Sequence, residues 1–204
     1  MRALRFVLAC AVAATVPLSG RAATGQVVPP APLTLNSARV SLDGTSNVHA
    51  FTASTATVTI RGIEIAGVPG EDVLEHVLQP GNLQAFEVSI PTTSLTSPKE
   101  GIDKNMHKAL KAQEHPDIRF RLRGLEQAAD AYRAPGLLTI AGVEKEVTLT
   151  LNVERKGGAL AVTGETDLLM TDYGITPPKA MLGMLKTDPK VHIRLELLLS
   201  AALS

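Results

Sequence analysis

The chain has 204 residues, a length typical of one domain or of two small ones. Hydrophobic residues make up 45% of it and the 20 basic residues balance the 20 acidic ones, a globular composition that excludes a disordered chain. Zero net charge and an aromatic content of 3%, without tryptophan, argue against nucleic-acid binding, because that function needs basic surface and stacking side chains.

The first segment has the layout of a secretory signal peptide. Arg2 and Arg5 precede an apolar run at 6–18, and small residues follow where a signal peptidase could cut. The alternative is an uncleaved membrane anchor, but the run is shorter than the ~20 residues that a spanning helix needs. The expected division is a signal peptide (1–23), a flexible, proline-rich lead-in (24–34) and one domain (35–204).

Cleavage would place the protein in the periplasm or outside the cell, and it would change the composition. Cys10, the only cysteine, lies in the removed segment, so disulfides and cysteine-based metal sites are excluded. Loss of Arg2, Arg5 and Arg21 takes three from the 20 basic residues and leaves 17 against 20 acidic ones. The exported chain is therefore expected to be mildly acidic.

Alternation of apolar and polar residues with period two is the main signal after residue 34. Ile118, Phe120 and Leu122, for example, alternate with three arginines. A pleated strand sends successive side chains to opposite faces, so each such segment has one face for a core and one for water. The segments with this pattern are 57–61, 86–90, 118–123, 147–153 and 191–197.

Turn residues between these runs predict sequential hairpins. A glycine-containing loop at 141–145 would join the strands 137–140 and 146–153, and Lys156-Gly157-Gly158 would join the next pair. About eight strands with few long connections favour a meander closed into a barrel. We therefore predict an all-β fold, an eight-stranded antiparallel barrel with one or two short helices.

One segment, 104–113, breaks the strand pattern. It contains good helix formers and no β-branched residue, and Met106 and Leu110 would share a face. Asp103 is the expected N-cap. We expect this helix to lie across one end of the barrel. Residues 71–78 are a weaker helical candidate.

Four stretches, in order along the chain, match a known family. They are Gly44-Thr45-Ser46-Asn47-Val48-His49-Ala50-Phe51, a block from Val88 through Lys104-Asn105-Met106-His107-Lys108-Ala109-Leu110 to Phe120, the segment 136–147, and Met170-Thr171-Asp172-Tyr173-Gly174-Ile175. On these motifs the chain resembles the YceI-like proteins, some of which bind polyisoprenoid lipids, as a divergent branch. The resemblance implies a lipocalin-like barrel with an elongated apolar lumen and an isoprenoid or other long-chain lipid as ligand.

The resulting prediction is an exported, non-catalytic protein that holds such an apolar ligand in its lumen. No cofactor, metal or nucleic-acid partner is expected. Transient contact with a membrane is compatible with this function, and the sequence leaves the oligomeric state open. The candidate ligand-binding residues of the lumen are His49, Phe51, Phe86, Val88, Met106, Leu110, Phe120, Leu138, Ile140 and Met181.

The polar candidates each have a plainer interpretation. The five histidines lack the spacing of a zinc protease, and no cysteine completes a site. His49 is the best single functional candidate, although a hydrogen bond from its ring to the 44–47 turn is the favoured interpretation. His192 is expected in water. Asp172 beside Tyr173 could form an acid pair or simply end a strand. With no Gly-x-Ser-x-Gly motif either, no enzyme is predicted.

Two other functions compete with a lipid carrier. An outer-membrane barrel would need an apolar outer face with aromatic girdles, which the outward arginines of 119–123 oppose. A filled barrel that acts through its surface, as a stress or envelope accessory protein, would have no continuous cavity. The apolar stretch 181–185 could form a lid at the mouth of a lumen or pack under the last strand.

Overall fold

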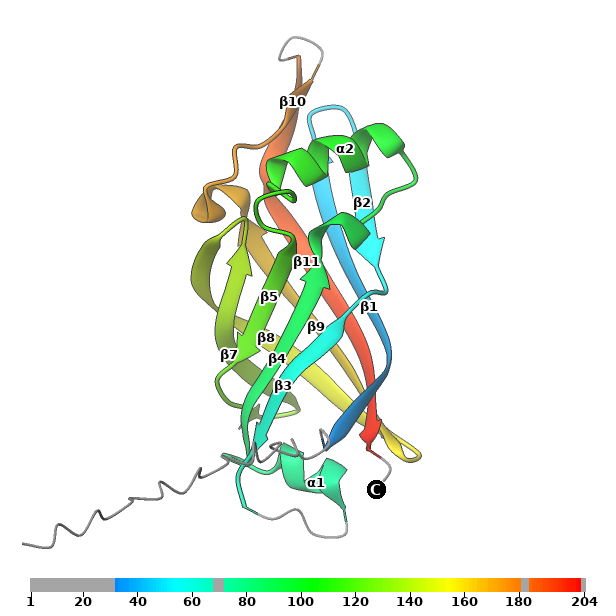
Figure 1. Ribbon diagram of the computed structural model, residues 1–204, viewed down its shortest axis with the longest axis vertical. Helices are drawn as coiled ribbons and strands as arrows, with labels where there is room; N and C mark the ends of the chain where they lie inside the picture. The colour runs from blue at the N-terminus through cyan, green and yellow to red at the C-terminus, as the bar shows by residue number, and fades with distance from the viewer. Residues whose placement is uncertain (1–31, 68–71, 181–183, 203–204) are drawn as a thin grey trace, which may run out of the picture.

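The computed structural model describes residues 32–67, 72–180 and 184–202, and it is a strongly curled antiparallel sheet with short helices at its ends (Figure 1). The predicted all-β class is therefore confirmed. The strands are β1 (Leu33–Ser46), β2 (Ala50–Thr55), β3 (Thr59–Ile65), β4 (Leu83–Pro91), β5 (Asp117–Leu122), β6 (Glu126–Ala128), β7 (Ala131–Ile140), β8 (Val143–Lys156), β9 (Ala159–Leu169), β10 (Lys179–Ala180) and β11 (Leu185–Ala201). The helices are α1 (Val73–Leu78), α2 (Glu100–Ala109) and the 3-10 turns η1 (Thr92–Ser94) and η2 (Met170–Tyr173).

The strand order explains how the sheet closes. Hydrogen bonding follows β2-β1-β11-β9-β8-β7-β5-β4-β3, with β6 and β10 as short additions. Among the described strands β2 pairs with β1 and β3 pairs with β4, and residues 56–58 alone separate β2 from β3. The segment 50–65 thus acts as one interrupted strand that connects both ends of the sheet. Counted in this way, the barrel has the eight strands that were predicted.

The strand boundaries differ slightly from the expected ones. The turn between β7 and β8 consists of Ala141 and Gly142, both at positive φ (50° and 81°), which matches the twist of a tight two-residue hairpin. β8 therefore begins at Val143, inside the predicted loop 141–145. β1 begins at Leu33, so the last two residues assigned to the lead-in belong to the barrel.

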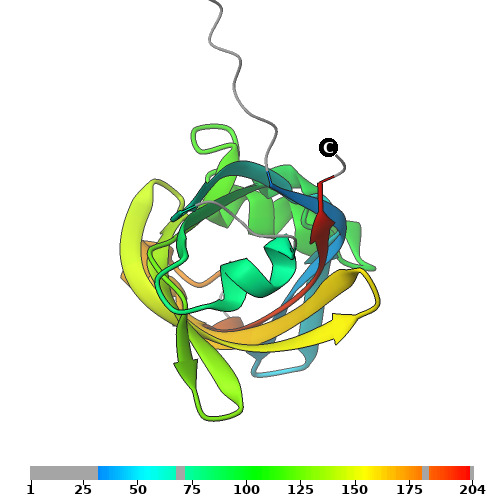
Figure 2. The ribbon, with the colours of Figure 1, turned by 90° about the horizontal axis from the view of Figure 1, so that it is seen from below.

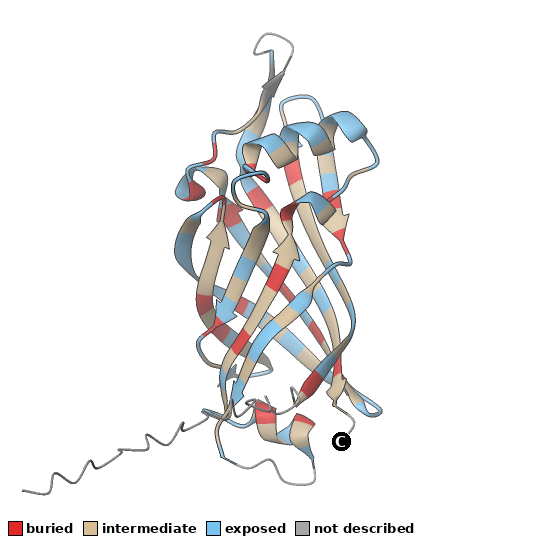
Figure 3. Cartoon of the chain, viewed as in Figure 1, coloured by how far each residue is buried: buried red, intermediate tan, exposed pale blue. Residues whose placement is uncertain are grey.

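Charged side chains on the outer wall form cross-strand ion pairs. Arg121 lies 3.3 Å from Glu87, and Arg123 lies 2.8 Å from Glu146. Figure 3 shows exposed residues interleaved with buried and intermediate ones along the strands, as alternation requires. His192 was expected in water, but its Nδ1 lies within hydrogen-bond distance, 2.9 Å, of Asp167, because β11 and β9 place the two residues opposite each other.

The two helices close opposite ends of the barrel. α2 lies across the upper end in Figure 1, where β2 and β10 also end, as the sequence predicted. α1 lies within the ring of strands when the barrel is seen from below (Figure 2). None of the helices in the described part of the chain has the length and apolar character needed to cross a membrane.

The start of α2 differs from the prediction. The helix begins at Glu100 rather than Lys104, and Lys99 occupies the N-cap position without a side-chain capping bond. Asp103 lies in the first turn, where its carboxylate accepts a hydrogen bond of 2.7 Å from the Ser97 backbone N–H. The predicted cap was wrong because the loop before the helix folds back onto this turn. His107 Nε2 lies 2.7 Å from the Leu95 carbonyl oxygen, a second tie to the same loop.

The core consists of two clusters along the barrel. The lower cluster surrounds Leu74 and Val77 of α1 together with Phe86, Leu122 and Leu149. The upper cluster lies beneath α2 and comprises Leu95, Leu110, Ala141, Leu168, Tyr173, Ile175 and Val191. Each cluster surrounds one part of the barrel lumen.

Candidate functional site

The lumen contains two adjoining chambers. The upper chamber has a volume of about 500 Å³ and lies under α2, and the lower one has about 170 Å³ and lies above α1. The larger volume falls within the range of small-molecule sites. The chambers adjoin because five side chains line both of them: Val40, Ile90, Leu138, Leu168 and Ile193.

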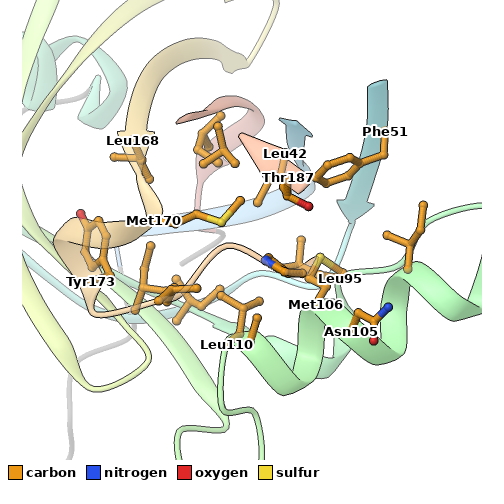
Figure 4. Close-up of a pocket in the computed structure, with 18 of the residues that line it drawn as sticks. Leu42, Phe51, Leu95, Asn105, Met106, Leu110, Leu168, Met170, Tyr173 and Thr187 are labelled. Atoms are coloured by element: carbon orange, nitrogen blue, oxygen red, sulfur yellow. The ribbon is translucent and has the colours of Figure 1, made fainter. Parts of the chain in front are cut away.

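Apolar side chains form most of the wall of the upper chamber. In Figure 4, Met106 and Leu110 of α2 lie below the chamber and Leu42 and Met170 lie above it. Met106 and Leu110 are one helical turn apart, so the same face of α2 carries both. The helix therefore supplies one wall of the chamber as well as the cover of the barrel end.

The lower chamber is even less polar. Thr166 is the single polar residue among those described around it. Val77 and Leu78 of α1 contribute to its floor, next to the inward positions of β4 such as Phe86 and Val88. An apolar chain can fill this space without leaving a polar group unpaired, whereas a buried polar ligand atom would find almost no partner here.

Two phenylalanine rings in the lumen lie against glycines of neighbouring strands. A Cβ on Gly44 would lie 2.3 Å from Cζ of Phe51, and a Cβ on Gly136 would lie 2.6 Å from Cζ of Phe120. Both glycines therefore make room for an aromatic ring, as glycines next to aromatics often do in curved sheets. This arrangement places Phe51 and Phe120 on the walls of the lumen.

Apart from the buried Tyr173, five polar side chains are described around the upper chamber. They come from the β1–β2 turn, the start of α2 and the start of β11. Each of them is exposed or half-buried, so water reaches this rim. We call this set the mouth: Ser46, His49, Lys99, Asn105 and Thr187.

The interpretation of His49 changes with the structure. Its backbone, rather than its ring, forms the turn: the Ser46 hydroxyl donates to the His49 carbonyl oxygen at 2.8 Å and accepts from the His49 N–H at 3.1 Å. The ring belongs to an exposed residue at the mouth. The alternative in which the ring bonds the 44–47 turn finds no support among the described contacts.

Tyr173 and Asp172 do not form an acid pair. Asp172 is exposed, whereas Tyr173 is 2% exposed and its hydroxyl has no hydrogen-bond partner among the described residues. Burial, followed by the nearby charge of Asp172, raises the pKa of Tyr173 to about 12. The phenol therefore keeps its proton at physiological pH. Among the described residues, no three His, Cys, Asp or Glu side chains converge in a way that could hold a metal ion.

The candidates chosen from the sequence come together in the lumen. His49, Phe51, Met106, Leu110 and Ile140 line the upper chamber, Leu138 lines both, and Phe86, Val88 and Phe120 line the lower one. Met181 lies outside the described residues. A role for any of them in ligand binding stays a prediction.

Sequence reasoning missed a second group of lumen residues. Leu42 on β1, Leu168 on β9 and Ile193 on β11 line the upper chamber, although 191–197 had been identified as an alternating strand. The alternation shows which face points inward, but it does not show at which height the barrel is hollow. That depends on which side chains meet across the lumen.

Comparison with known proteins places this barrel in a family. A family model described as the YceI-like domain matches residues 34–198. The chain belongs to the YceI-like family. This confirms the resemblance drawn from the four sequence motifs. A search among curated proteins found no match.

Solved structures of the same shape support the YceI-like barrel. Burkholderia cenocepacia BcnA superposes with a TM-score of 0.63 at 14% identity, covering 79% of this chain and 95% of that protein. A polyisoprenoid-binding domain from Saccharophagus degradans, implicated in plant cell wall breakdown, gives 0.61 at 13% identity, with 84% and 99% covered. The Campylobacter jejuni YceI protein gives 0.52 at 13% identity, with 72% and 85% covered. At these identities the likeness establishes the fold alone.

Proposed function

We propose that this YceI-like protein binds an elongated lipid-like molecule, an isoprenoid or another long apolar chain, inside its barrel. The observation that carries the proposal is the apolar upper chamber of about 500 Å³, which adjoins a second apolar chamber below it. Burial of apolar surface supplies the free energy of binding for such a ligand, at roughly 25 cal/mol per Å². The polyisoprenoid-binding domain from Saccharophagus degradans has the same fold, which agrees with this ligand class.

The distribution of polar groups suggests how the ligand lies. Its chain would occupy the lumen, and any hydroxyl, carbonyl or other polar group would lie at the mouth, near Asn105, Lys99 and Thr187. The reverse orientation would bury the polar group in the lower chamber, where Thr166 is the single polar neighbour described. A buried polar group without a partner costs about 1–3 kcal/mol, which favours the first orientation.

The alternative is a filled barrel that acts through its surface. That function predicts a lumen packed with side chains, and the two adjoining chambers argue against it.

We also propose that the protein is exported and non-catalytic. Export rests on the residue pattern of 1–23, which lies outside the described residues. The absence of catalysis rests on the apolar lining and on the neutral, buried phenol of Tyr173.

Native mass spectrometry of protein purified from its own host, followed by lipid extraction, tests the proposal. We expect a bound mass that is released into organic solvent, and a matched pair of variants on β5 locates it. Ile118 lines the upper chamber, while its neighbour Arg119 points outward and is exposed. Ile118→Trp should fill part of the chamber and lower the bound fraction at least about tenfold, whereas Arg119→Trp should retain the ligand.

Repeated recovery of ligand-free protein from several preparations would favour the filled-barrel function instead. Equal ligand occupancy in Ile118→Trp and Arg119→Trp, with both variants folded by circular dichroism, would place the ligand somewhere other than the upper chamber.

A further inference from the structure

The β1–β2 turn meets the start of β11 beside the mouth of the barrel. The Asn47 side chain donates to the Met184 carbonyl oxygen at 2.8 Å and accepts from the Lys186 N–H at 2.8 Å. The Asn47 N–H donates to the Lys186 carbonyl oxygen at 3.1 Å. One asparagine thus joins the β1–β2 turn to the start of β11 across more than 130 residues of sequence. The β1–β2 turn and residues 184–186 therefore form a single edge of the barrel.

This edge exposes apolar side chains to solvent. Val48 is 67% exposed and Met184 is 68% exposed, and they flank the bonds that Asn47 makes. The one other large hydrophobic residue that is exposed in the described part of the chain is Leu169, at 43%. Contact of these side chains with water is unfavourable. Because Val48 and Met184 lie on the same edge, this edge has the character of a contact surface.

Lysines without a described ion-pair partner lie at the same end of the barrel. Some cations of the outer wall are neutralised: Arg121, Arg123 and Arg194 each pair with a carboxylate. At the upper end, by contrast, no described carboxylate lies within ion-pair distance of five exposed lysines. These lysines are Lys99, Lys104, Lys108, Lys111 and Lys186.

Local hydrogen bonds engage part of the acidic charge at this end. Asp103 accepts from the Ser97 N–H at 2.7 Å, and Asp188 accepts from the Lys190 N–H at 2.8 Å. Glu100 and Glu114 are exposed without a described ion pair. Lys104 and Lys108 are four residues apart on α2, on the helix side away from the chamber. The solvent side of the covering helix therefore carries Lys104 and Lys108, with Glu100 one turn before Lys104 on the same side.

We propose that this end of the barrel docks onto the surface of an anionic lipid bilayer. Val48 and Met184 would enter the boundary between headgroups and acyl chains, and the lysines of α2 would lie over the anionic headgroups. A few apolar side chains combined with basic residues are the features that hold proteins reversibly on such surfaces. The exposed lysines of this end would attract anionic headgroups, which favours the bilayer as the occupant.

Docking in this orientation would bring the mouth against the membrane. Ser46 and His49 of the β1–β2 turn line both the docking edge and the upper chamber. A ligand could then move between the bilayer and the lumen without crossing water, where its apolar chain would be costly to expose. Membrane docking goes beyond ligand binding in the lumen, and either hypothesis can fail without the other.

Sedimentation with vesicles tests the docking surface on the full chain. Vesicles of phosphatidylcholine with 30% phosphatidylglycerol, about a third anionic as a probe of lipid charge, are compared with vesicles of phosphatidylcholine alone. We expect binding that requires the anionic lipid and weakens in high salt. Lys104→Glu with Lys108→Glu, and separately Val48→Ser with Met184→Ser, should each weaken it at least about tenfold. The matched control is Arg61→Glu with Arg133→Glu, exposed wall cations without a described ion pair, which should have little effect.

A site-specific probe separates docking from binding by the apolar segment 6–18. In a Cys10→Ser background, an environment-sensitive fluorophore is attached through Val48→Cys or, at the opposite end of the barrel, through Lys156→Cys. Anionic vesicles should shift the emission of the first to the blue and leave the second unchanged. Equal loss of binding in the wall control, a label at position 48 that stays in water, or chemical cross-linking into dimers through this edge would overturn the proposal. Because no lumen ligand is needed, an empty barrel that still docks would leave this inference standing while the lipid-binding function fails.

Discussion

The hydroxyl of Tyr173 is an exception to the rule that buried polar groups are hydrogen-bonded. The side chain is 2% exposed and packs in the upper core, and its oxygen has no partner among the described residues. The ring adds apolar surface to that core, while the oxygen adds only a desolvation cost. The aromatic body of this residue therefore stabilises the fold more than its polar atom does.

Removing this hydroxyl should not destabilise the protein. Tyr173→Phe is expected to leave the free energy of unfolding unchanged or to raise it by up to about 1–2 kcal/mol, since an unpaired buried group costs about 1–3 kcal/mol. Urea unfolding at neutral pH measures this, with Tyr132→Phe as the control for loss of a tyrosine. A loss of more than about 1 kcal/mol in Tyr173→Phe would mean that the hydroxyl has a partner.

The same substitution should change the alkaline behaviour. The pKa of Tyr173 is raised in the folded protein from 10.0 to about 12, so the unfolded chain loses the phenol proton first as the pH rises. The contribution of the protonated phenol to the free energy of unfolding is complete below pH 10.0 and is lost as the pH approaches about 12. Between these values the stability of wild type should fall more steeply than that of Tyr173→Phe.

At the scale of elements, close contact between neighbouring strands depends on small residues. Gly136 on β7 faces the lumen, and a Cβ there would lie 2.6 Å from the Arg121 carbonyl oxygen of β5 as well as 2.6 Å from the Phe120 ring. The ring could rotate away, but the carbonyl belongs to the β5–β7 ladder and has no such freedom. No described atom lies within 4 Å of a Cβ on Gly158, in the β8–β9 turn.

Alanine substitution at these two glycines should have opposite effects. Gly136→Ala is expected to lower the free energy of unfolding by about 1–3 kcal/mol, because it overpacks the β5–β7 contact. Gly158→Ala should be neutral or slightly stabilising, because alanine restricts the unfolded chain without a clash. Urea midpoints compare the two variants, and similar destabilisation in both would show that steric fit at Gly136 is not the cause.

At the scale of the whole molecule, α1 lies across the lower end of the barrel and α2 across the upper one. α1 has six residues, too few to be stable alone. Asp72 caps it by accepting from the Leu74 and Glu75 N–H groups, at 3.1 Å each, and pairs with Arg155 of β8 at 2.6 Å. One carboxylate thus both starts the helix and fastens it to the barrel.

Substitutions at Asp72 should separate these two roles. Asp72→Ala removes the cap and the ion pair, so α1 amides should exchange hydrogen roughly fivefold faster or more. Asp72→Asn keeps a good cap and should behave closer to wild type, and Asp130→Asn, in an exposed turn, controls for lost charge. Identical exchange in Asp72→Ala and wild type would show that lumen contacts alone hold α1.

The ion pair also predicts a pH dependence at this end of the barrel. The hydrogen bond from Arg155, with those from the helix N–H groups, holds the pKa of Asp72 below its ordinary value of 3.8. The contribution of the ionised Asp72 carboxylate to stability is present above the ordinary pKa and is lost as the pH falls through the lowered pKa of the folded protein. Protection of α1 should therefore drop in acid in wild type but stay flat in Asp72→Asn.

Local patterns in the sequence were sufficient for the barrel itself. Ile118, Phe120 and Leu122 alternate with arginines, and this period specifies an inner and an outer face without knowledge of any partner strand. Alternating strands and the turn at Gly157 and Gly158 were enough to predict an antiparallel eight-stranded sheet. The choice of His49, Phe51 and Phe120 as lumen residues came from the same periodicity and from the family resemblance.

Tertiary structure alone decided what the chain does not encode locally. The joining of β2 and β3 into a closing strand, the hydrogen bond from Ser97 that displaces Asp103 from its predicted cap, and the unpaired hydroxyl of Tyr173 all depend on residues that meet only after folding. The height at which the lumen is hollow, and the hydrogen bond from Asn47 to the Met184 carbonyl oxygen, depend on such residues too. Periodicity reports the direction of a side chain, whereas cavities and edges depend on distances between segments far apart in the chain.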